Sequence, residues 1–172
     1  SRGLGDVYKR QADEGFVTVS TNPCGEIPLC PYDSCRLLAL NLLSYVDNPF
    51  KKDAKFNFDK FRSHVAMAMR MMDDIIDLEL EKVEQIIEKI AADPEDEDVR
   101  RVELELWKKI LGMAQKGRRT GLGITAEGDM LAALGLVYGS EEAIAFAVEV
   151  QKTLAVEAYR ASVKMAAERG AF

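Results

Sequence analysis

The sequence predicts an α/β fold in which long helices pack on a few strands. Three observations support this: short stretches of strand-like apolar residues, a loop dense in Pro and Gly between the first two of them, and long stretches with helical periodicity and capping residues. The order of strand, loop, strand, helices, strand and helices favours α/β over a helical bundle. Three strands are too few to close a barrel or to cover these helices, so we expect the chain to be part of a larger domain.

The beginning of the chain predicts two strands joined by a shaped loop. Residues 1–14 are polar and aperiodic, and we expect a leader that is disordered or not native to the protein, followed by one partial domain over 15–172. Phe16–Ser20 alternates apolar and polar side chains and predicts a strand. Thr21–Asp33 is dense in Pro and Gly and predicts a loop without a regular ladder. Cys35–Tyr45 predicts a buried strand, although its leucines also allow a short helix.

Two long helices are predicted in the middle of the chain. Asn57 can cap the first, which continues toward Ile90. Its predicted buried face consists of Phe61, Val65, Ala68, Met72 and Ile75. The start signal of the second helix is Asp93 as N-cap followed by Pro94 in the first helical position. We expect this helix to run to about Lys116 and to stop at Gly117.

The last third of the chain predicts a short strand and two further helices. Thr120–Thr125 is expected to be a strand or turn, and Glu127–Leu134 a short helix. Ser140 can cap a long helix that ends at Gly170. The residues predicted to share one face of this helix are Ile144, Val148, Ala155, Ala158, Ser162 and Met165.

Composition and charge exclude several kinds of partner. Hydrophobic residues make up 48% of the 172 residues, and the net charge is −6 at pH 7. An acidic chain gives no electrostatic reason to expect binding to nucleic-acid polymers or to anionic membranes. The apolar runs Ile75–Leu80 and Met130–Val137 are too short to cross a bilayer. Since no signal pattern is present, we expect a cytoplasmic protein.

Three cysteines, Cys24, Cys30 and Cys35, lie close together in the sequence. Their number is odd and too small for a disulfide scaffold, and a structural zinc site would need four ligands. We therefore expect no metal site. In a reducing compartment these thiols are expected to be catalytic, redox-active or simply buried.

The loop places Asn22, Cys24 and Glu26 at alternate positions. In an extended segment such side chains project to one side, so an amide, a thiol and a carboxylate would face the same space. A neighbouring carboxylate raises the pKa of a thiol, which disfavours nucleophilic thiolate chemistry. A thiol that carries a hydrogen atom needs no such activation, while the carboxylate could take a proton and the amide could orient a substrate hydroxyl. A turn with a buried Cys is an interpretation that the residues alone leave open.

The segment Thr21–Leu29, with the sequence Thr-Asn-Pro-Cys-Gly-Glu-Ile-Pro-Leu, is similar to the finger loop of ribonucleotide reductases. The version with Pro after Asn and Gly after Cys resembles the vitamin B12-dependent class II enzymes. Three later segments resemble successive parts of the same family: Ser34–Leu42, Arg118–Thr125 and Ala158–Phe172. The resemblance covers about Phe16 to Phe172 and implies a fragment of the ten-stranded α/β barrel of that family.

The resemblance implies radical-based reduction of ribonucleoside di- or triphosphates to 2′-deoxyribonucleotides, by an enzyme of which this piece alone would be inactive. Cys24 would hold the thiyl radical and take the 3′ hydrogen atom, Glu26 would deprotonate the 3′ hydroxyl, and Asn22 would hydrogen-bond the substrate. Cys35 would be one member of a redox-active disulfide whose partner lies outside this chain. The substrate-binding residues that the resemblance implies are Thr21, Asn22, Pro23, Cys24, Gly25 and Glu26.

The resemblance also implies adenosylcobalamin as cofactor and a thioredoxin-like reductant as electron donor, and it leaves a homodimer open for the full-length enzyme. One alternative is a class I large subunit, whose radical comes from a metal-containing partner protein. The other is a non-catalytic helical interaction module with a Cys-containing loop. Cys30 matches no catalytic position, and we expect a spare buried thiol or one that pairs with Cys35.

Overall fold

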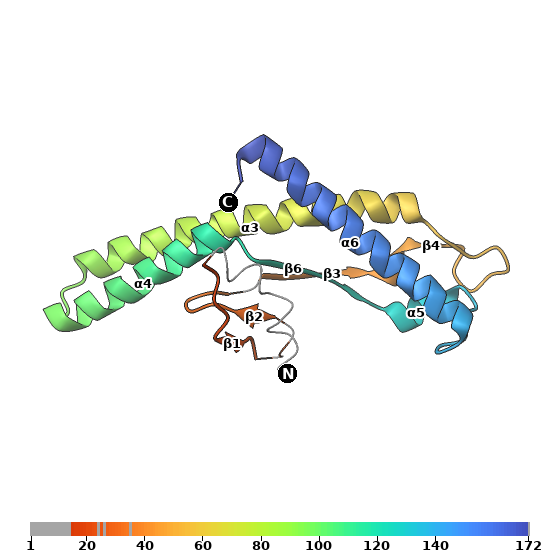
Figure 1. Cartoon of the computed structure of the whole chain (residues 1–172), viewed down its shortest axis with the longest axis horizontal. Coiled ribbons are helices and arrows are strands. Elements are labelled where there is room, and N and C mark those ends of the chain that lie inside the picture. Colours follow the sequence, from red (N-terminus) through yellow and green to blue (C-terminus); the bar gives the residue numbers. More distant parts are fainter. Residues whose placement is uncertain (1–14, 24, 26, 35, 172) are drawn as a thin grey trace. The chain divides into compact units, whose positions relative to one another are not determined.

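The computed structural model describes residues 15–23, 25, 27–34 and 36–171 (Figure 1). Strands and helices both occur in these ranges, which confirms the predicted α/β class. The described strands form three two-stranded sheets. The chain divides into two compact units, of which the first combines the described residues up to Arg36 with Asp74–Thr120, and the second combines Leu37–Asp73 with Gly121–Ala171. None of the helices in the described ranges is long and apolar enough to span a bilayer.

The first unit begins with a small antiparallel hairpin. Strand β1 (Ser20–Thr21) pairs with β2 (Pro28–Leu29), so that Ser20 lies opposite Leu29 and Thr21 opposite Pro28. The predicted strand Phe16–Ser20 is wrong except at its last residue, because Val17 and Val19 are exposed and their alternation covers no core. The prediction that the loop has no ladder is wrong at β2. Pro28 is tolerated there because each strand of this hairpin is only two residues long.

Helix α3 (Phe58–Ala92) confirms the predicted cap and most of the predicted face. Asn57 Oδ1 accepts a hydrogen bond from the Lys60 N–H at 3.0 Å. Ile75 is 43% exposed, whereas Ile76 is fully buried. The prediction was wrong by one residue because, at 3.6 residues per turn, position 76 lies closer than 75 to the centre of the face. The other buried residues of that face are Phe61, Val65, Ala68, Met72, Val83 and Ile90.

Helix α4 (Glu97–Gly117) starts three residues later than the predicted signal. Its N-cap is Asp96, whose side chain accepts a hydrogen bond from the Asp98 N–H at 2.9 Å. Asp93 instead closes the end of α3 and forms an ion pair with Lys89 at 2.7 Å. The helix ends at Gly117, as predicted, although the residue that adopts the left-handed conformation is Arg118, with a φ of 36°.

The second unit contains the remaining strands and two helices. Strand β3 (Arg36–Asn41) pairs with β6 (Thr120–Thr125), and the 3-10 helix η1 (Leu42–Tyr45) follows β3 directly. The two interpretations of Cys35–Tyr45 are thus both present, one after the other. The predicted burial of the strand is wrong, because its side chains alternate between half-buried and exposed and Leu37 is 65% exposed.

The core of the second unit is built around an aromatic cluster. Tyr45 and Phe61 stack edge-to-face with ring centroids 4.9 Å apart, and Phe56 contacts both rings. Burial raises the pKa of the Tyr45 hydroxyl, which lies 3.2 Å from His64 Nδ1. Further elements of this unit are β4 (Val46–Asp47), β5 (Lys55–Phe56), α5 (Glu127–Ala133) and α6 (Glu141–Arg169). Of the two alternatives predicted for 120–125, a strand or a turn, the structure has the strand, and the predicted short helix after it is confirmed.

Helix α6 begins as predicted but buries a different face. The Ser140 hydroxyl accepts a hydrogen bond from the Ala143 N–H at 3.2 Å. Ile144 and Val148 are exposed, and of the predicted face only Met165 is buried. The buried residues are Ala143, Val150, Leu154, Ala161 and Met165. The sequence could not decide between the faces because apolar residues occur on both.

The position of the buried face of α3 can be tested with two neighbouring isoleucines. In the full-length protein, Ile76→Ala is expected to lower the free energy of unfolding of this domain by about 2–5 kcal/mol, because it empties a fully buried position. Ile75→Ala is expected to cost about 1 kcal/mol or less, since its side chain is partly in water. Urea denaturation followed by circular dichroism measures both values. Equal losses would contradict the assigned face.

Candidate functional site

The tip of the β1–β2 hairpin is closed by three hydrogen bonds that all involve Asn22. The Asn22 N–H donates to the Ile27 carbonyl at 3.1 Å, and the Ile27 N–H donates to Asn22 Oδ1 at 3.0 Å. The Gly25 N–H donates to the Asn22 carbonyl at 2.9 Å. One asparagine therefore supplies two acceptors and one donor to the backbone of its own loop, which fixes where the loop turns.

The local sequence explains why the chain turns here. The hydrogen bond from Gly25 to Asn22 joins residues three apart, as in a β-turn, and Pro23 occupies the second turn position, where its fixed φ is favourable. Gly25 has a φ of +78°, a conformation that glycine adopts without steric cost. Pro28 lacks an N–H group, so the chain has no unpaired donor at that position. Asn, Pro and Gly in this order therefore favour a tight, defined tip.

The described part of the hairpin includes four of the predicted substrate-binding residues. Asn22 and Gly25 are half-buried, and Thr21 and Pro23 are exposed. Cys24 and Glu26, predicted as catalytic, and Cys35, predicted as redox-active, lie outside the described residues. The Asn22 carboxamide closes the turn, because its oxygen accepts a hydrogen bond from the Ile27 N–H. The alternate spacing of Asn22, Cys24 and Glu26 in the sequence did not indicate this structural role.

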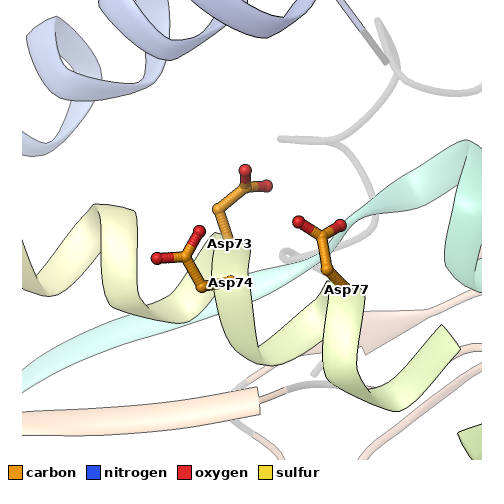
Figure 2. A group of neighbouring side chains, drawn as sticks. All are labelled: Asp73, Asp74 and Asp77. Atoms are coloured by element: carbon orange, nitrogen blue, oxygen red, sulfur yellow. The ribbon is translucent and has the colours of Figure 1, made fainter. Parts of the chain in front are cut away.

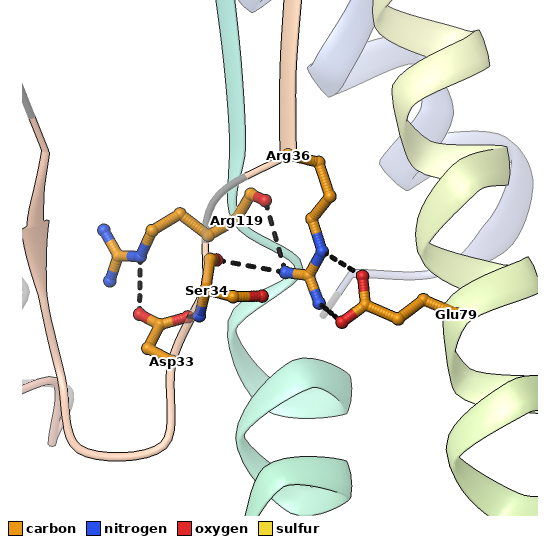
Figure 3. Close-up of polar contacts among 5 residues, drawn as sticks. All are labelled: Asp33, Ser34, Arg36, Glu79 and Arg119. Carbon is orange, nitrogen blue, oxygen red and sulfur yellow. Dashed lines mark hydrogen bonds and ion pairs between the residues drawn. The ribbon is translucent and has the colours of Figure 1, made fainter. Parts of the chain in front are cut away.

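A second group of polar residues combines three that lie on both sides of Cys35 in the sequence with two from later in the chain (Figure 3). They are Asp33, Ser34 and Arg36, and Glu79 and Arg119. Asp33 and Arg119 form an ion pair, with 2.7 Å between Oδ2 and Nε. Arg36 binds both carboxylate oxygens of Glu79, at 2.6 Å through Nε and 2.5 Å through Nη2. Arg36 Nη1 also donates to the Ser34 carbonyl at 3.2 Å and to the Arg119 carbonyl at 3.4 Å. These residues come from the loop before β3, from the first position of β3, from α3 and from the segment between α4 and β6.

Sequence reasoning missed this network. The available signal was Arg36 itself, a charge at the start of an otherwise apolar run, because a charged residue in such a place needs a partner. Nothing in the sequence identified that partner as Glu79, which lies 43 residues away. The network borders a cavity of 210 Å³, lined by Tyr32, Asp33, Ser34, Arg36, Glu79, Ile110 and Ala114.

Cys30 is buried beside the same network. Cys30 is only 5% exposed, and its sulfur lies 3.9 Å from Arg119 Nη2. Burial raises the pKa of the Cys30 thiol, and the nearby Arg119 opposes that rise without cancelling it. The expected burial of this thiol is confirmed, and the group is protonated at neutral pH.

Three carboxylates gather on α3, at Asp73, Asp74 and Asp77 (Figure 2). Their oxygens lie within 4.8 Å of one another. Asp73 pairs with Arg169 at 2.6 Å, and Asp77 pairs with Arg118 at 2.8 Å. These ion pairs give two of the carboxylates a structural role on the helix surface.

Comparison with known proteins decides the family. The family described as "Ribonucleotide reductase, barrel domain" matches residues 9–172. The chain belongs to this family. This ribonucleotide reductase segment contains the hairpin and both strands of the β3–β6 sheet within the matched range. No solved structure matches it.

Curated relatives carry reductase names. The chain is 37% identical over 153 residues to a "Vitamin B12-dependent ribonucleoside-diphosphate reductase" of Thermoplasma acidophilum, covering 89% of this chain and 16% of that relative. A protein of the same name from Mycobacterium tuberculosis is 32% identical, with 89% and 18% covered. A "Ribonucleoside-diphosphate reductase subunit alpha" of Chlamydia pneumoniae is 27% identical, with 97% and 14% covered. The chain thus spans about a sixth of the length of the curated relatives it matches.

The burial of Cys30 gives a testable difference in reactivity. In the native full-length protein we expect iodoacetamide at pH 8 to alkylate Cys30 much more slowly than in urea, because burial shields the sulfur and keeps it protonated. Mass spectrometry of the peptide that contains Cys30 measures the rate. Alkylation equally fast in both conditions would show that the thiol is not buried.

Proposed function

We propose that this chain is part of the catalytic subunit of a ribonucleotide reductase, which converts ribonucleotides to 2′-deoxyribonucleotides by radical chemistry. The observation that carries the proposal is the family match over residues 9–172, which includes the closed hairpin tip with the motif Asn22 to Glu26. Residues 15–172 would form a partial catalytic barrel domain that includes the finger loop 21–29, and residues 1–14 a leader. The pairing of β3 with β6 supports their assignment to the ten-stranded barrel. This segment alone would be inactive.

Cys24 would carry the sulfur radical at the hairpin tip. It would take the hydrogen atom from the ribose 3′ carbon, forming an S–H bond, and return a hydrogen atom to that carbon at the end of the cycle. Glu26 would accept the proton of the 3′ hydroxyl. The defined turn at Asn22 and Gly25 supports this role, because radical transfer between sulfur and carbon requires the two atoms to be held in near contact.

Asn22 would have two functions in one side chain. Its oxygen accepts the Ile27 N–H and so maintains the turn. Its amide N–H groups are the donors suited to a substrate hydroxyl. Substrate contacts would extend over the tip residues Thr21, Asn22, Pro23, Cys24, Gly25 and Glu26.

Cys35 would supply electrons for the reduction at the 2′ carbon. In that step the 2′ C–O bond breaks and the oxygen leaves as water. Cys35 and a partner thiol outside this chain give up two electrons and form a disulfide, and their two hydrogens end in the water and on the 2′ carbon. A thioredoxin-like dithiol protein would then reduce the disulfide by exchange. These reactions fit the reducing conditions of the cytoplasm.

Adenosylcobalamin is the cofactor that the names of the relatives suggest. A Cβ built at Gly25 would meet no described atom within 4 Å, and Asn22 and Gly25 are only half-buried. The described tip residues therefore fit the close approach of a bulky group, and Pro23 and Gly25 would lie against it. When bound, the cofactor supplies the one-electron oxidation that starts the radical on the protein.

The relatives also bear on the substrate and on the alternatives. Their names contain "ribonucleoside-diphosphate", which favours diphosphates over triphosphates. A class I large subunit is less favoured, because the chlamydial subunit alpha is 27% identical while the vitamin B12-dependent relatives reach 32% and 37%. Membership of the reductase family disfavours a non-catalytic interaction module. A homodimer of the full-length enzyme is part of the proposal.

The radical role of Cys24 can be tested by removing its thiol. In the full-length enzyme, Cys24→Ala is expected to abolish deoxynucleotide formation while the affinity for ribonucleoside diphosphate stays within about twofold, because the thiol reacts but contributes little binding. Cys30→Ala, which removes the buried thiol nearby in sequence, is the matched control and should keep most of the activity. Chromatography of the nucleotide products measures deoxynucleotide formation by both variants. Turnover by the Cys24 variant would refute the role.

The role of Cys35 predicts a different kinetic defect. Cys35→Ser is expected to stop multiple turnover with a thioredoxin-type donor, because no disulfide can form to pass electrons inward. The measurement is steady-state deoxynucleotide formation by the full-length enzyme. Unchanged steady-state activity would rule out Cys35 as a redox thiol.

A further inference from the structure

Helix α6 of the second unit has apolar residues on two opposite sides, and only one side is packed in this structure. The packed side consists of Ala143, Val150, Leu154, Ala161 and Met165. On the opposite side, a row of exposed residues follows steps of three or four positions, which keeps them on one face of a helix. We call this row the outer face of α6; its residues are Ile144, Val148, Lys152, Ala155, Val156, Tyr159 and Val163.

The outer face has the composition of an interface rather than of a solvated surface. Tyr159 is 76% exposed and Val163 71% exposed, and Ile144 and Val148 are exposed as well. A helix that is apolar on both sides is typical of a position that is buried on both sides. Contiguous exposed apolar side chains mark interaction surfaces. An open groove of 470 Å³ lies on this face, lined by Ala155, Val156, Tyr159, Arg160 and Val163.

The shape of the outer face fits a second helix. The face extends from Ile144 to Val163, which is about 28 Å along the helix axis at 1.5 Å per residue. Side chains three and four residues apart form ridges, and the side chains of another helix insert between such ridges. A strand fits less well, because the backbone groups of α6 are already paired within the helix and would leave those of the strand without partners.

Lys152 lies near the middle of the outer face and indicates the charge of the segment that covers it. Within the described residues Lys152 forms no ion pair. If two copies of the chain paired through this face about a twofold axis, the axis would pass near its middle and bring the two Lys152 side chains together. Like charges in that position repel each other. A second copy is therefore disfavoured, whereas a segment with an acidic residue opposite Lys152 is favoured.

The length of the relatives favours a segment of the same polypeptide. This chain covers 16% and 18% of two vitamin B12-dependent relatives, so more than four fifths of each relative has no counterpart in it. A stretch of that length can supply further helices. A segment of the same polypeptide is also present at a high effective concentration and loses less translational freedom on docking than a separate protein does.

We propose that the outer face of α6 is the docking surface for an amphipathic helix from the part of the full-length protein outside residues 1–172. Apolar side chains of that helix pack against Tyr159 and Val163 and fill the groove, and an acidic residue of the helix pairs with Lys152. The inference uses the length of the relatives and does not depend on the radical chemistry, so it can fail while the proposed function holds.

The test is nitration of tyrosines by tetranitromethane in the native full-length protein. We expect Tyr159 to be nitrated about tenfold or more slowly in the native protein than in urea, because the docked helix must open before the reagent reaches the ring. Tyr138, which is 81% exposed in the loop between α5 and α6, is the internal control and should react at similar rates in both conditions. Mass spectrometry of the two peptides measures the rates. A Tyr159 that reacts as fast in the native protein as in urea would overturn the inference.

Two further measurements test the nature of the segment that covers α6. Lys152→Glu in the full-length protein places two acids together and is expected to reduce the protection of Tyr159 about fivefold or more. Lys52→Glu, the same charge reversal in the exposed turn between β4 and β5, is the matched control and should leave the protection unchanged. Equal protection in both variants would overturn the acidic partner of Lys152. Protection that disappears when dilution produces monomers, as measured by light scattering, would overturn the intramolecular helix, because a second copy would then cover the face.

Discussion

The interaction on which the candidate site depends most is the closure of the hairpin tip by Asn22. Its backbone and side chain together make three hydrogen bonds, which hold Ile27 and Gly25 in a defined turn. Strands of two residues each could not impose such a turn by themselves, because a short isolated ladder is only marginally stable. The position of any group at the tip therefore depends on one asparagine, through both its backbone and its side chain, and this links the stability of the loop to the chemistry proposed for it.

The segment after the hairpin is held by a different kind of force. There the contacts are ion pairs: Asp33 with Arg119, which is largely removed from water, and Arg36 with Glu79, whose side chain is 32% exposed. Local hydrogen bonds suit a tip that must remain open to a substrate, whereas ion pairs to distant elements suit a strand start that must stay fixed.

The sequence predicted features that are determined locally. The N-caps Asn57 and Ser140 were predicted correctly, because capping residues act over a few positions, and Thr120–Thr125 adopts the strand that was one of its two predicted alternatives. The buried face of α6 was predicted wrongly, since apolar residues on two faces leave the choice to tertiary packing. The strand predicted at Phe16–Ser20 was also wrong, because its alternating apolar side chains do not face a core. The tip motif was visible in the sequence, but the bond from Ile27 to Asn22 and the partner of Arg36 were not, because both depend on the folded path of the chain.

The most direct test of the account is a structure of the full-length protein with a ribonucleoside diphosphate bound. The account predicts that Asn22 Oδ1 still accepts the Ile27 N–H while its amide nitrogen and the Glu26 carboxylate lie within hydrogen-bond distance of the ribose hydroxyls. It also predicts the Cys24 sulfur within about 3.5 Å of the 3′ carbon. A nucleotide bound away from the hairpin, or a Cys24 sulfur directed away from the sugar, would contradict it.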